Sequence, residues 1–585
     1  MSMSKNIARL AVTAGLTAAL SFGGVMAPVT MAFAADATGS TVTFVDTDYA
    51  TSSTYKGIQI FKATVTKTGE NTTVSGIEWA GADADEQQAI QRAVVNAIQT
   101  IKGDYNSTNA QDAAEWLNAN AGVNGTDSRI ENNNVLNTIA KNLSAKGFTW
   151  KTTEQGNNTL GGLDAGYWLF LTASVKKPVE GSAASQSTDA FTSPIFKLVD
   201  GTNPVTIVPK KNIPTVEKKI VSDADSKEHD AADSQIGQDV TYNLYGTIAD
   251  NYDSYDTYYY QFSDQISNGL TLQDGAQVYL YASKDAAQKD LKHESPTLNI
   301  TNSFKRVAES GNKTTWTCNN LKDISGATIN KDSCIVVSYT AQINENAVVG
   351  LDNYKEGNPN TVTLYYSNNP MTTDHGQTVP DTVRDYTYGL KINKVDLGTE
   401  RTLNGAKFTI MVRSADNKDA AGKYVQSDGK LGKDPYQFET TSDGTFTVKG
   451  LDTGTYTVNE VEAPQGGYTT VNSFDFTITP ELGTDPDAKL TDVKYTLQAN
   501  GQQDQIIIGT PDGVKDDNKL EAKADTATND DGTFNITVGD TKQVGLPLTG
   551  LNGVTFTWIA GGAVLCIGVA HLIRSRKQAE ESEQE

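Results

Sequence analysis

Short alternations of apolar and polar residues fill most of the chain and predict a protein made mainly of β-strands. Runs such as QDVTYNLYGTI (238–248) and CIVVSYTAQI (334–343) place an apolar side chain at about every second position. A period of two is typical of strands that bury one face. Gly, Asn and Asp separate the runs, as expected of turns.

The runs fall into three segments, 35–211, 212–383 and 384–545, which we expect to be three domains. The second and third segments contain short strands only, which is typical of β-sandwiches. The first also contains two stretches with helical spacing, DEQQAIQRAVVNAIQTI (85–101) and NAQDAAEWLNANAG (109–122). The predicted fold class is therefore mainly β, with tandem immunoglobulin-like β-sandwich domains and some helix in the first.

The N-terminal residues 1–34 are typical of a signal peptide. Lys5 and Arg9 form a basic beginning, an apolar run follows, and Ala32-Phe33-Ala34 fits a small-x-small cleavage site. A first transmembrane helix is the alternative. Cleavage at this site would export the rest of the chain.

The C-terminus combines three features in a fixed order. The pentapeptide LPLTG (546–550) comes first, and Pro547 favours an extended backbone there. Residues 551–573 are predicted to form a transmembrane helix, since about twenty apolar residues span about 30 Å. Residues 574–585 begin with basic side chains, as expected of a cytoplasmic tail. A permanent single-pass membrane protein is the alternative.

Composition narrows the possible functions. The chain has 585 residues and a formal net charge of −23, with no basic patch, so nucleic acid is not an expected partner. The four histidines and three cysteines form no metal-ligand motif, and no phosphate-binding loop or nucleophile elbow occurs. We therefore expect no cofactor, no bound metal and no enzymatic turnover.

Two of the cysteines lie in neighbouring strand-like runs. Cys318 in TTWTCNNL and Cys334 in DSCIVVSY could pair across a hairpin in an oxidising compartment. Two reduced thiols are the alternative.

The C-terminal arrangement resembles a sortase sorting signal: Leu-Pro-x-Thr-Gly, a hydrophobic span and a basic tail. Leu546, Pro547, Thr549 and Gly550 match the pattern. The resemblance implies that a sortase cysteine attacks the Thr549 carbonyl and transfers the acyl group to an amine.

The third segment resembles the sortase-assembled pilins of Gram-positive bacteria. YTVNEVEAPQGGY (456–468) is similar to their E-box, although it has one extra residue before Tyr468. INKVDLGTERTLNGAKF (392–408) resembles the first strands of a collagen-adhesin B-type (Cna B) domain. The second segment resembles a Cna A-type or fimbrial middle domain. The resemblance implies tandem Cna A/B-type sandwiches.

NPVTIVPKK (203–211) resembles the pilin motif, although the aromatic residues usual in that motif are missing. The resemblance implies that Lys210 is the amine that accepts Thr549 of the next subunit. Lys211 is the alternative. Lysine suits this role because it presents an amine on a flexible stem.

The resemblance also implies amide bonds inside the domains, each formed by a buried lysine, a carboxylic acid and an Asn or Asp acceptor. Burial favours the neutral amine and the protonated acid. In the third segment these residues are Lys394, Glu460 and Asp540, with Asn535 as the fallback acceptor. An ion-pair cluster without a bond is the alternative.

In the second segment the alternation in VEKKI favours Lys218 over Lys219 as the nucleophile. The expected acid is Asp264 and the expected acceptor is Asn360. Asn358 and Asn368 are alternative acceptors. No comparable set of residues stands out in the first segment.

Two functions follow from this resemblance. The first is the backbone subunit of a covalent pilus, anchored to the cell wall and supporting adhesion. Its partners would be a class C (pilin) sortase, further copies of itself, minor pilins and peptidoglycan, with a host matrix protein or glycan as a further partner. The second is a monomeric wall-anchored adhesin that binds a host matrix protein or glycan.

Overall fold

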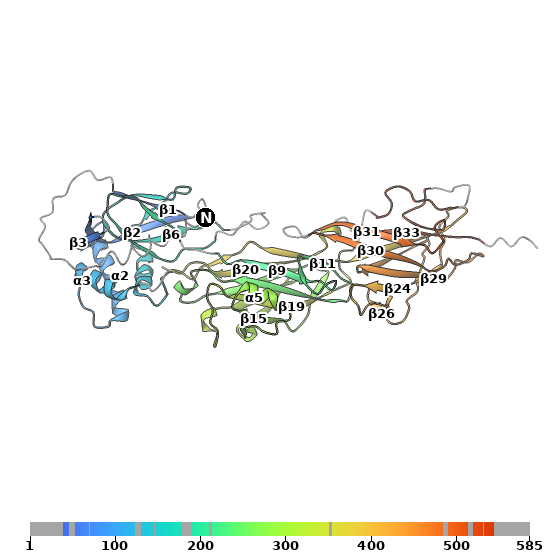
Figure 1. The fold of residues 1–585 in the computed structure, drawn as a ribbon, viewed down its shortest axis with the longest axis horizontal. Helices are drawn as coiled ribbons and strands as arrows, with labels where there is room; N and C mark the ends of the chain where they lie inside the picture. Colours follow the sequence, from blue (N-terminus) through green and yellow to red (C-terminus); the bar gives the residue numbers. More distant parts are fainter. Residues whose placement is uncertain are drawn as a thin grey trace, which may run out of the picture.

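The computed structural model describes residues 39–45, 53–68, 71–122, 130–145, 147–177, 189–209, 213–349, 354–483, 489–512, 519–529 and 532–542. Three bodies follow one another along the long axis of the molecule in sequence order (Figure 1). We call them the first part (39–209), the second part (213–386) and the third part (388–542). The prediction of a mainly β chain with tandem domains and some helix in the first is confirmed.

The first part combines two sheets with a helical layer. The smaller sheet has the order β5-β1-β8, and β3-β2-β6-β7 form the larger sheet, with β4 beside β2. Its strands are β1 Ser40–Phe44, β2 Thr54–Thr68, β3 Asn71–Trp79, β4 Lys151–Thr152, β5 Thr159–Leu163, β6 Gly166–Ser174, β7 Ile195–Val199 and β8 Val205–Ile207.

Three helices pack together in the first part: α2 Ala84–Ile101, α3 Ala110–Asn120 and α4 Val135–Ser144. The residues that precede them are N-caps: Asp83, Asn109 and Asn134. The side chain of each N-cap accepts a hydrogen bond from a backbone amide of the first helical turn. The helical spacing predicted α2 and α3. It did not predict α4, although the buried Val135, Leu136, Ile139, Ala140 and Leu143 have helical spacing over its ten residues.

The second part is a sandwich of two seven-stranded sheets. One has the order β10-β9-β12-β19-β15-β16, with β14 beside β19, and the other has the order β11-β22-β20-β13-β18-β17, with β21 beside β20. The bounds are β9 Val216–Val221, β10 Glu228–His229, β11 Ala231–Asp233, β12 Asp239–Thr247, β13 Tyr260–Ile266, β14 Leu270–Leu272, β15 Gln277–Tyr281, β16 Leu298–Asn299, β17 Lys305–Glu309, β18 Lys313–Cys318, β19 Cys334–Ile343, β20 Asn358–Ser367, β21 His375–Gln377 and β22 Asp381–Tyr386; helix α5 is Lys284–Lys289.

The prediction that Cys318 and Cys334 form a disulfide is wrong. Both are buried free thiols. β18 and β19 do not form a hairpin, because they belong to opposite sheets. Cys318 packs in the core between the sheets, whereas Cys334 packs with Tyr281 and Ala287 in a separate cluster beside α5. The two runs are adjacent in sequence but their cysteines lie in different layers.

The third part is a second sandwich, with a four-stranded sheet β28-β23-β33-β32 and a seven-stranded sheet β26-β25-β24-β29-β30-β31 that has β27 beside β24. The bounds are β23 Tyr388–Asp396, β24 Lys407–Ala415, β25 Tyr424–Val425, β26 Leu431–Gly432, β27 Phe438–Glu439, β28 Thr445–Leu451, β29 Gly454–Glu462, β30 Phe474–Leu482, β31 Leu490–Gln498, β32 Ile506–Ile508 and β33 Phe534–Asp540. The first and last of these strands, β23 and β33, are parallel neighbours.

The second and third parts share a tight joint. Strand β22 continues through Tyr386, beyond the boundary expected at Val383, and β23 begins at Tyr388. Ile236 packs against Gly450, whose φ is +80° and where an added Cβ would lie 2.5 Å from the isoleucine. The Gln235 side-chain amide donates to the carbonyl oxygens of Gly429 and Gly450. These contacts join the two sandwiches through backbone as well as side chains.

Buried acidic side chains line this joint. Asp233 of the second part accepts hydrogen bonds from the amide and hydroxyl of Thr453 in the third part. Asp452 and Asp385 are also buried. Burial raises the pKa of Asp233 to about 6; the Thr453 hydrogen bonds oppose this shift and Asp223 adds to it. The joint therefore favours a protonated carboxyl.

No helix among the described residues is long and apolar enough to cross a membrane. The predicted signal peptide (1–34), the sorting motif (546–550), the predicted transmembrane helix (551–573) and the tail (574–585) all lie outside the described residues.

The raised pKa of Asp233 predicts a pH dependence of stability. The folded carboxyl holds its proton more tightly than the unfolded one, whose ordinary pKa is 3.8. The free energy of unfolding should therefore fall as the pH rises from about 4 to about 6, by at most about 3 kcal/mol from this group. Asp233→Asn should flatten this slope in thermal unfolding of the exported chain. Asp239→Asn, at an exposed position on β12, is the matched control, and an unchanged slope in the Asp233 variant would contradict the assignment.

Candidate functional site

Among the lysines that the structure describes, two are fully buried, one in each sandwich. Lys218 and Lys394 both have a relative exposure of 0%. A lysine is rarely buried without a partner, because removing its charge from water is costly. Each of these lysines contacts a carboxyl group and a second side chain that carries a carbonyl.

In the second part the contacts cross the core between the two sheets. Lys218 lies on β9, whereas Asp264 and Asn360 lie on β13 and β20 of the opposite sheet. The Lys218 Nζ donates to Asp264 Oδ1 and to Asn360 Oδ1. The structure therefore brings together the three residues that the sequence analysis expected.

A fourth residue, Tyr339 on β19, completes this site. Its hydroxyl accepts from Lys218 Nζ at 3.0 Å and from Asn360 Nδ2 at 2.8 Å, and it donates to Asp264 Oδ2. The sequence analysis missed this residue. Its alternation in CIVVSYTAQI indicated an inward-facing side chain, but nothing in one strand indicates which opposite residues it meets.

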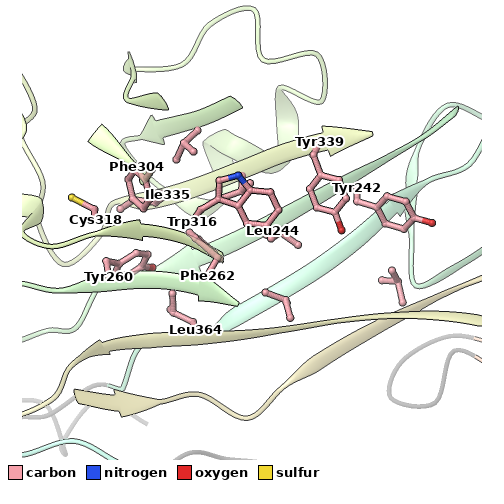
Figure 2. Close-up of a cluster of buried hydrophobic side chains, with 14 of the residues drawn as sticks. Tyr242, Leu244, Tyr260, Phe262, Phe304, Trp316, Cys318, Ile335, Tyr339 and Leu364 are labelled. Carbon is pink, nitrogen blue, oxygen red and sulfur yellow. The ribbon is translucent and has the colours of Figure 1, made fainter. Parts of the chain in front are cut away.

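Aromatic rings surround the Lys218 amine. Figure 2 shows Tyr339, Tyr242 and Trp316 gathered in the core, and both Tyr242 and Trp316 stack on Tyr339 with ring centroids 5.5 Å apart. Burial lowers the pKa of Lys218 to about 8, although the Asp264 charge opposes that shift. A neutral amine with a free lone pair is thus accessible near neutral pH.

In the third part the lysine and the acceptor lie on neighbouring strands of one sheet. Lys394 on β23 is in register with Val538 on the parallel strand β33, and Asp540 ends that strand. The Lys394 Nζ contacts Asp540 Oδ1. Glu460 reaches it from β29 in the opposite sheet, with its two oxygens 2.9 and 3.0 Å from Nζ.

The carboxyl of Asp540 is suited to accept an amine. Burial raises its pKa to about 7; Lys394 opposes this shift and Glu460 adds to it. A protonated carboxyl is more electrophilic than a carboxylate and can release water. Glu460 is held in place because its Oε2 accepts from the Val471 amide at 2.9 Å.

The alternative residues have other partners. Lys219 lies on the opposite face of β9 and binds Asp230 and Glu217. The Asn358 side chain bonds to the backbone of Val348 and Asp385, and the Asn368 amide donates to Asp189. Asn535 is in register with Lys391 and bonds with Asn529.

Both sites are suited to the same reaction. In each site the lysine amine contacts the side-chain Oδ1 of the acceptor, Asn360 or Asp540. A second carboxyl group, from Asp264 or Glu460, lies close enough to the amine to exchange a proton with it. Each arrangement can form an amide between two side chains. The described residues contain no group of His, Cys, Asp and Glu that could hold a metal ion.

Lys210, Lys211 and the pentapeptide with Thr549 lie outside the described residues. The residues just before Lys210 are described: β8 pairs in parallel with β1, and Pro209 is buried while Val208 is 54% exposed.

Comparisons with known proteins match one domain of the chain to a family model and about half of the chain to a bacterial surface protein. A family model described as the SpaA prealbumin-like fold domain matches residues 389–485. The trypsin-resistant surface T6 protein of Streptococcus pyogenes serotype M6 is 25% identical over 321 residues, which cover 51% of this chain and 52% of that protein. The match thus spans about half the length of this relative.

Two solved structures are similar over most of the chain. The T6 backbone pilin of serotype M6 Streptococcus pyogenes has 16% identity and a TM-score of 0.47, with 86% of this chain and 98% of that chain covered. The major pilin SpaD from Corynebacterium diphtheriae has 15% identity and a TM-score of 0.42, with the same coverage of 86% and 98%. Residues 389–485 of the chain thus match a prealbumin-like SpaA domain, and about half of the chain is similar to the streptococcal surface T6 protein.

Proposed function

We propose that this chain is the backbone subunit of a covalent cell-surface pilus of a Gram-positive bacterium. The observation that carries the proposal is the pair of fully buried lysines in tandem sandwiches, each in contact with an acid and an acceptor. The similarity to backbone pilins supports the same function.

The subunits are joined head to tail by a class C sortase. After export directed by residues 1–34, the sortase cleaves LPLTG between Thr549 and Gly550 and holds Thr549 as a thioester. The Lys210 amine of another copy attacks that thioester, the new amide forms and the sortase thiol leaves. Because donor and acceptor are different groups at distant positions of the chain, each copy can serve as donor to one copy and acceptor from another, and such a head-to-tail contact produces a filament.

The filament ends on the cell wall and carries other subunits. Transfer of the last Thr549 to an amine of peptidoglycan anchors the polymer, and minor pilins join by the same chemistry. Adhesion to a host matrix protein or glycan is the role of the assembled fibre. The first, second and third parts then bear tension in series, with the boundary between the last two after Tyr386 rather than at the expected Val383.

Amides inside the sandwiches resist that tension. The neutral Lys218 amine attacks Cγ of Asn360 and ammonia leaves, while Lys394 attacks Cγ of Asp540 and water leaves. Asp264 and Glu460 take the proton from each amine and return a proton to the leaving group. The first bond would join opposite sheets. The second would join the first and last strands of the third part, so tension entering at β33 would pass directly to β23.

Mass spectrometry tests the internal bonds. The exported chain, made in a host without sortase, should weigh about 35 Da less than its sequence, from the loss of one ammonia (about 17 Da) and one water (about 18 Da). Lys218→Ala should restore about 17 Da and Lys394→Ala about 18 Da beyond the change of side chain. Lys219→Ala is the matched control and should keep both losses. A wild-type mass equal to that of the sequence would exclude both amides.

Polymerisation is tested on boiled cell-wall extracts. Wild-type cells should give a ladder of bands on an immunoblot, because the intersubunit amide survives boiling in detergent. Lys210→Ala should give a single monomer band, whereas Lys211→Ala should keep the ladder. A single band from wild-type cells, with Thr549 joined only to peptidoglycan, would favour a monomeric wall-anchored adhesin instead.

A further inference from the structure

The Tyr339 hydroxyl touches every group of the proposed amide-forming site in the second part: Lys218, Asp264 and Asn360. We propose that Tyr339 is a catalytic residue, whose hydroxyl carries a proton from Asp264 to the departing nitrogen of Asn360. This inference rests on the proposed Lys218–Asn360 amide and adds the residue that expels its leaving group.

The hydrogen bonds divide the site into an attack side and a departure side. On the attack side, Lys218 Nζ faces Oδ1 of both Asp264 and Asn360. On the departure side, Asn360 Nδ2 lies 2.8 Å from the Tyr339 hydroxyl, which contacts the other Asp264 oxygen, Oδ2. The phenol is therefore the hydrogen-bonded link between the acid and the nitrogen that must leave as ammonia.

The ring of Tyr339 holds its hydroxyl in this position. Tyr339 is 3% exposed, and its ring is stacked between Tyr242 and Trp316. Strand β19 fixes its backbone between β12 and β15. Burial and the neighbouring Asp264 raise the pKa of Tyr339 well above 10, so its proton is retained until a stronger base appears beside it.

Such a base appears during the reaction. The Lys218 lone pair forms a bond to Cγ of Asn360, and the carbonyl electron pair moves to Oδ1. The carbon is then tetrahedral, and Nδ2 gains the lone pair that amide resonance had used. An amine nitrogen accepts a proton, whereas an amide nitrogen does not.

The proton transfers then balance. The Asp264 carboxylate, which accepts from Tyr339 at the start, takes a proton from the former Lys218 amine. Tyr339 gives its own proton to Nδ2 and takes in return the proton that Asp264 has just received. The Cγ–Nδ2 bond breaks, ammonia leaves, and the electron pair on Oδ1 restores the carbonyl. The tyrosine and the aspartic acid end in the forms in which they began.

The third part offers a natural comparison within the same chain. There the Lys394 amine lies 5.5 Å from the ring of Phe408, and Glu460 contacts the amine directly. The group that leaves Asp540 is water rather than ammonia. Removing the Tyr339 hydroxyl should therefore slow the first bond and leave the second unchanged.

The test follows bond formation over time in newly made exported chain, with intact mass read at intervals after synthesis. Tyr339→Phe keeps the ring and removes only the hydroxyl. The loss of about 17 Da should then appear about a hundredfold more slowly than in the wild type, within the range typical of general acid–base groups. The loss of about 18 Da at the third part should keep its wild-type rate.

Tyr260→Phe is the matched control, because Tyr260 is also fully buried in this core but donates to the Thr247 carbonyl. It should form both bonds at the wild-type rate. Near-ultraviolet circular dichroism checks that the Tyr339→Phe variant folds. If its second part is disordered, Tyr339→His is tested instead. Histidine keeps a side chain that can carry a proton, so this variant should recover part of the rate. Equal rates in wild type and Tyr339→Phe would overturn the role of Tyr339 alone. No loss of 17 Da in the wild type would overturn the proposed amide itself.

Discussion

A lysine amine held away from water is the interaction on which this molecule depends. Burial makes the charged form of Lys218 costly and lowers its pKa to about 8. The same burial aligns it with Asp264 and Asn360 from the opposite sheet. Without a bond, such a cluster is a costly way to stabilise a core, because desolvation offsets much of the attraction between buried charges. With a bond, the charges disappear and the two sheets are joined. The expense of burying these groups therefore has a chemical purpose in the proposed function.

The two sandwiches reach the same chemistry by different geometry. In the second part, lysine and acceptor come from opposite sheets, and a tyrosine joins the acid to the acceptor nitrogen. In the third part, lysine and acceptor come from adjacent parallel strands, and the acid reaches over from the other sheet. An Asp acceptor in the third part requires a protonated carboxyl, and burial supplies it by raising the pKa of Asp540 to about 7. Each acceptor type thus matches the groups around it.

The joint between these sandwiches is also built from buried polar groups. Gln235 donates to backbone carbonyls of the third part, and Asp233 bonds to Thr453 across the joint. Apolar side chains meet there too: Ile236 packs against Gly450, and Ala231 and Tyr386 of the second part join the apolar core of the third. The hydrogen bonds across the joint are directional and help to fix the relative orientation of the two sandwiches. For a chain pulled along its length, a fixed orientation keeps the load on the strands.

The sequence by itself determined the mainly β class, the tandem arrangement and helices α2 and α3, because periods of two and of 3.6 residues are local properties. It also singled out Lys218 and Lys394 by strand alternation and by resemblance. By resemblance it also named Asp264 and Asn360, and Glu460 and Asp540, as their partners. The tertiary structure decided between these residues and the alternatives, and it added Tyr339. Tyr339 and the acidic joint went unpredicted because most of their partners are far away in sequence. Tyr339 bonds to Asp264 and Lys218, which are 75 and 121 residues away, and Asp233 bonds to Thr453, which is 220 residues away. Strand pairing across such separations leaves no local pattern. The predicted disulfide between Cys318 and Cys334 was wrong because the two neighbouring runs form strands of different sheets, which their sequence does not indicate.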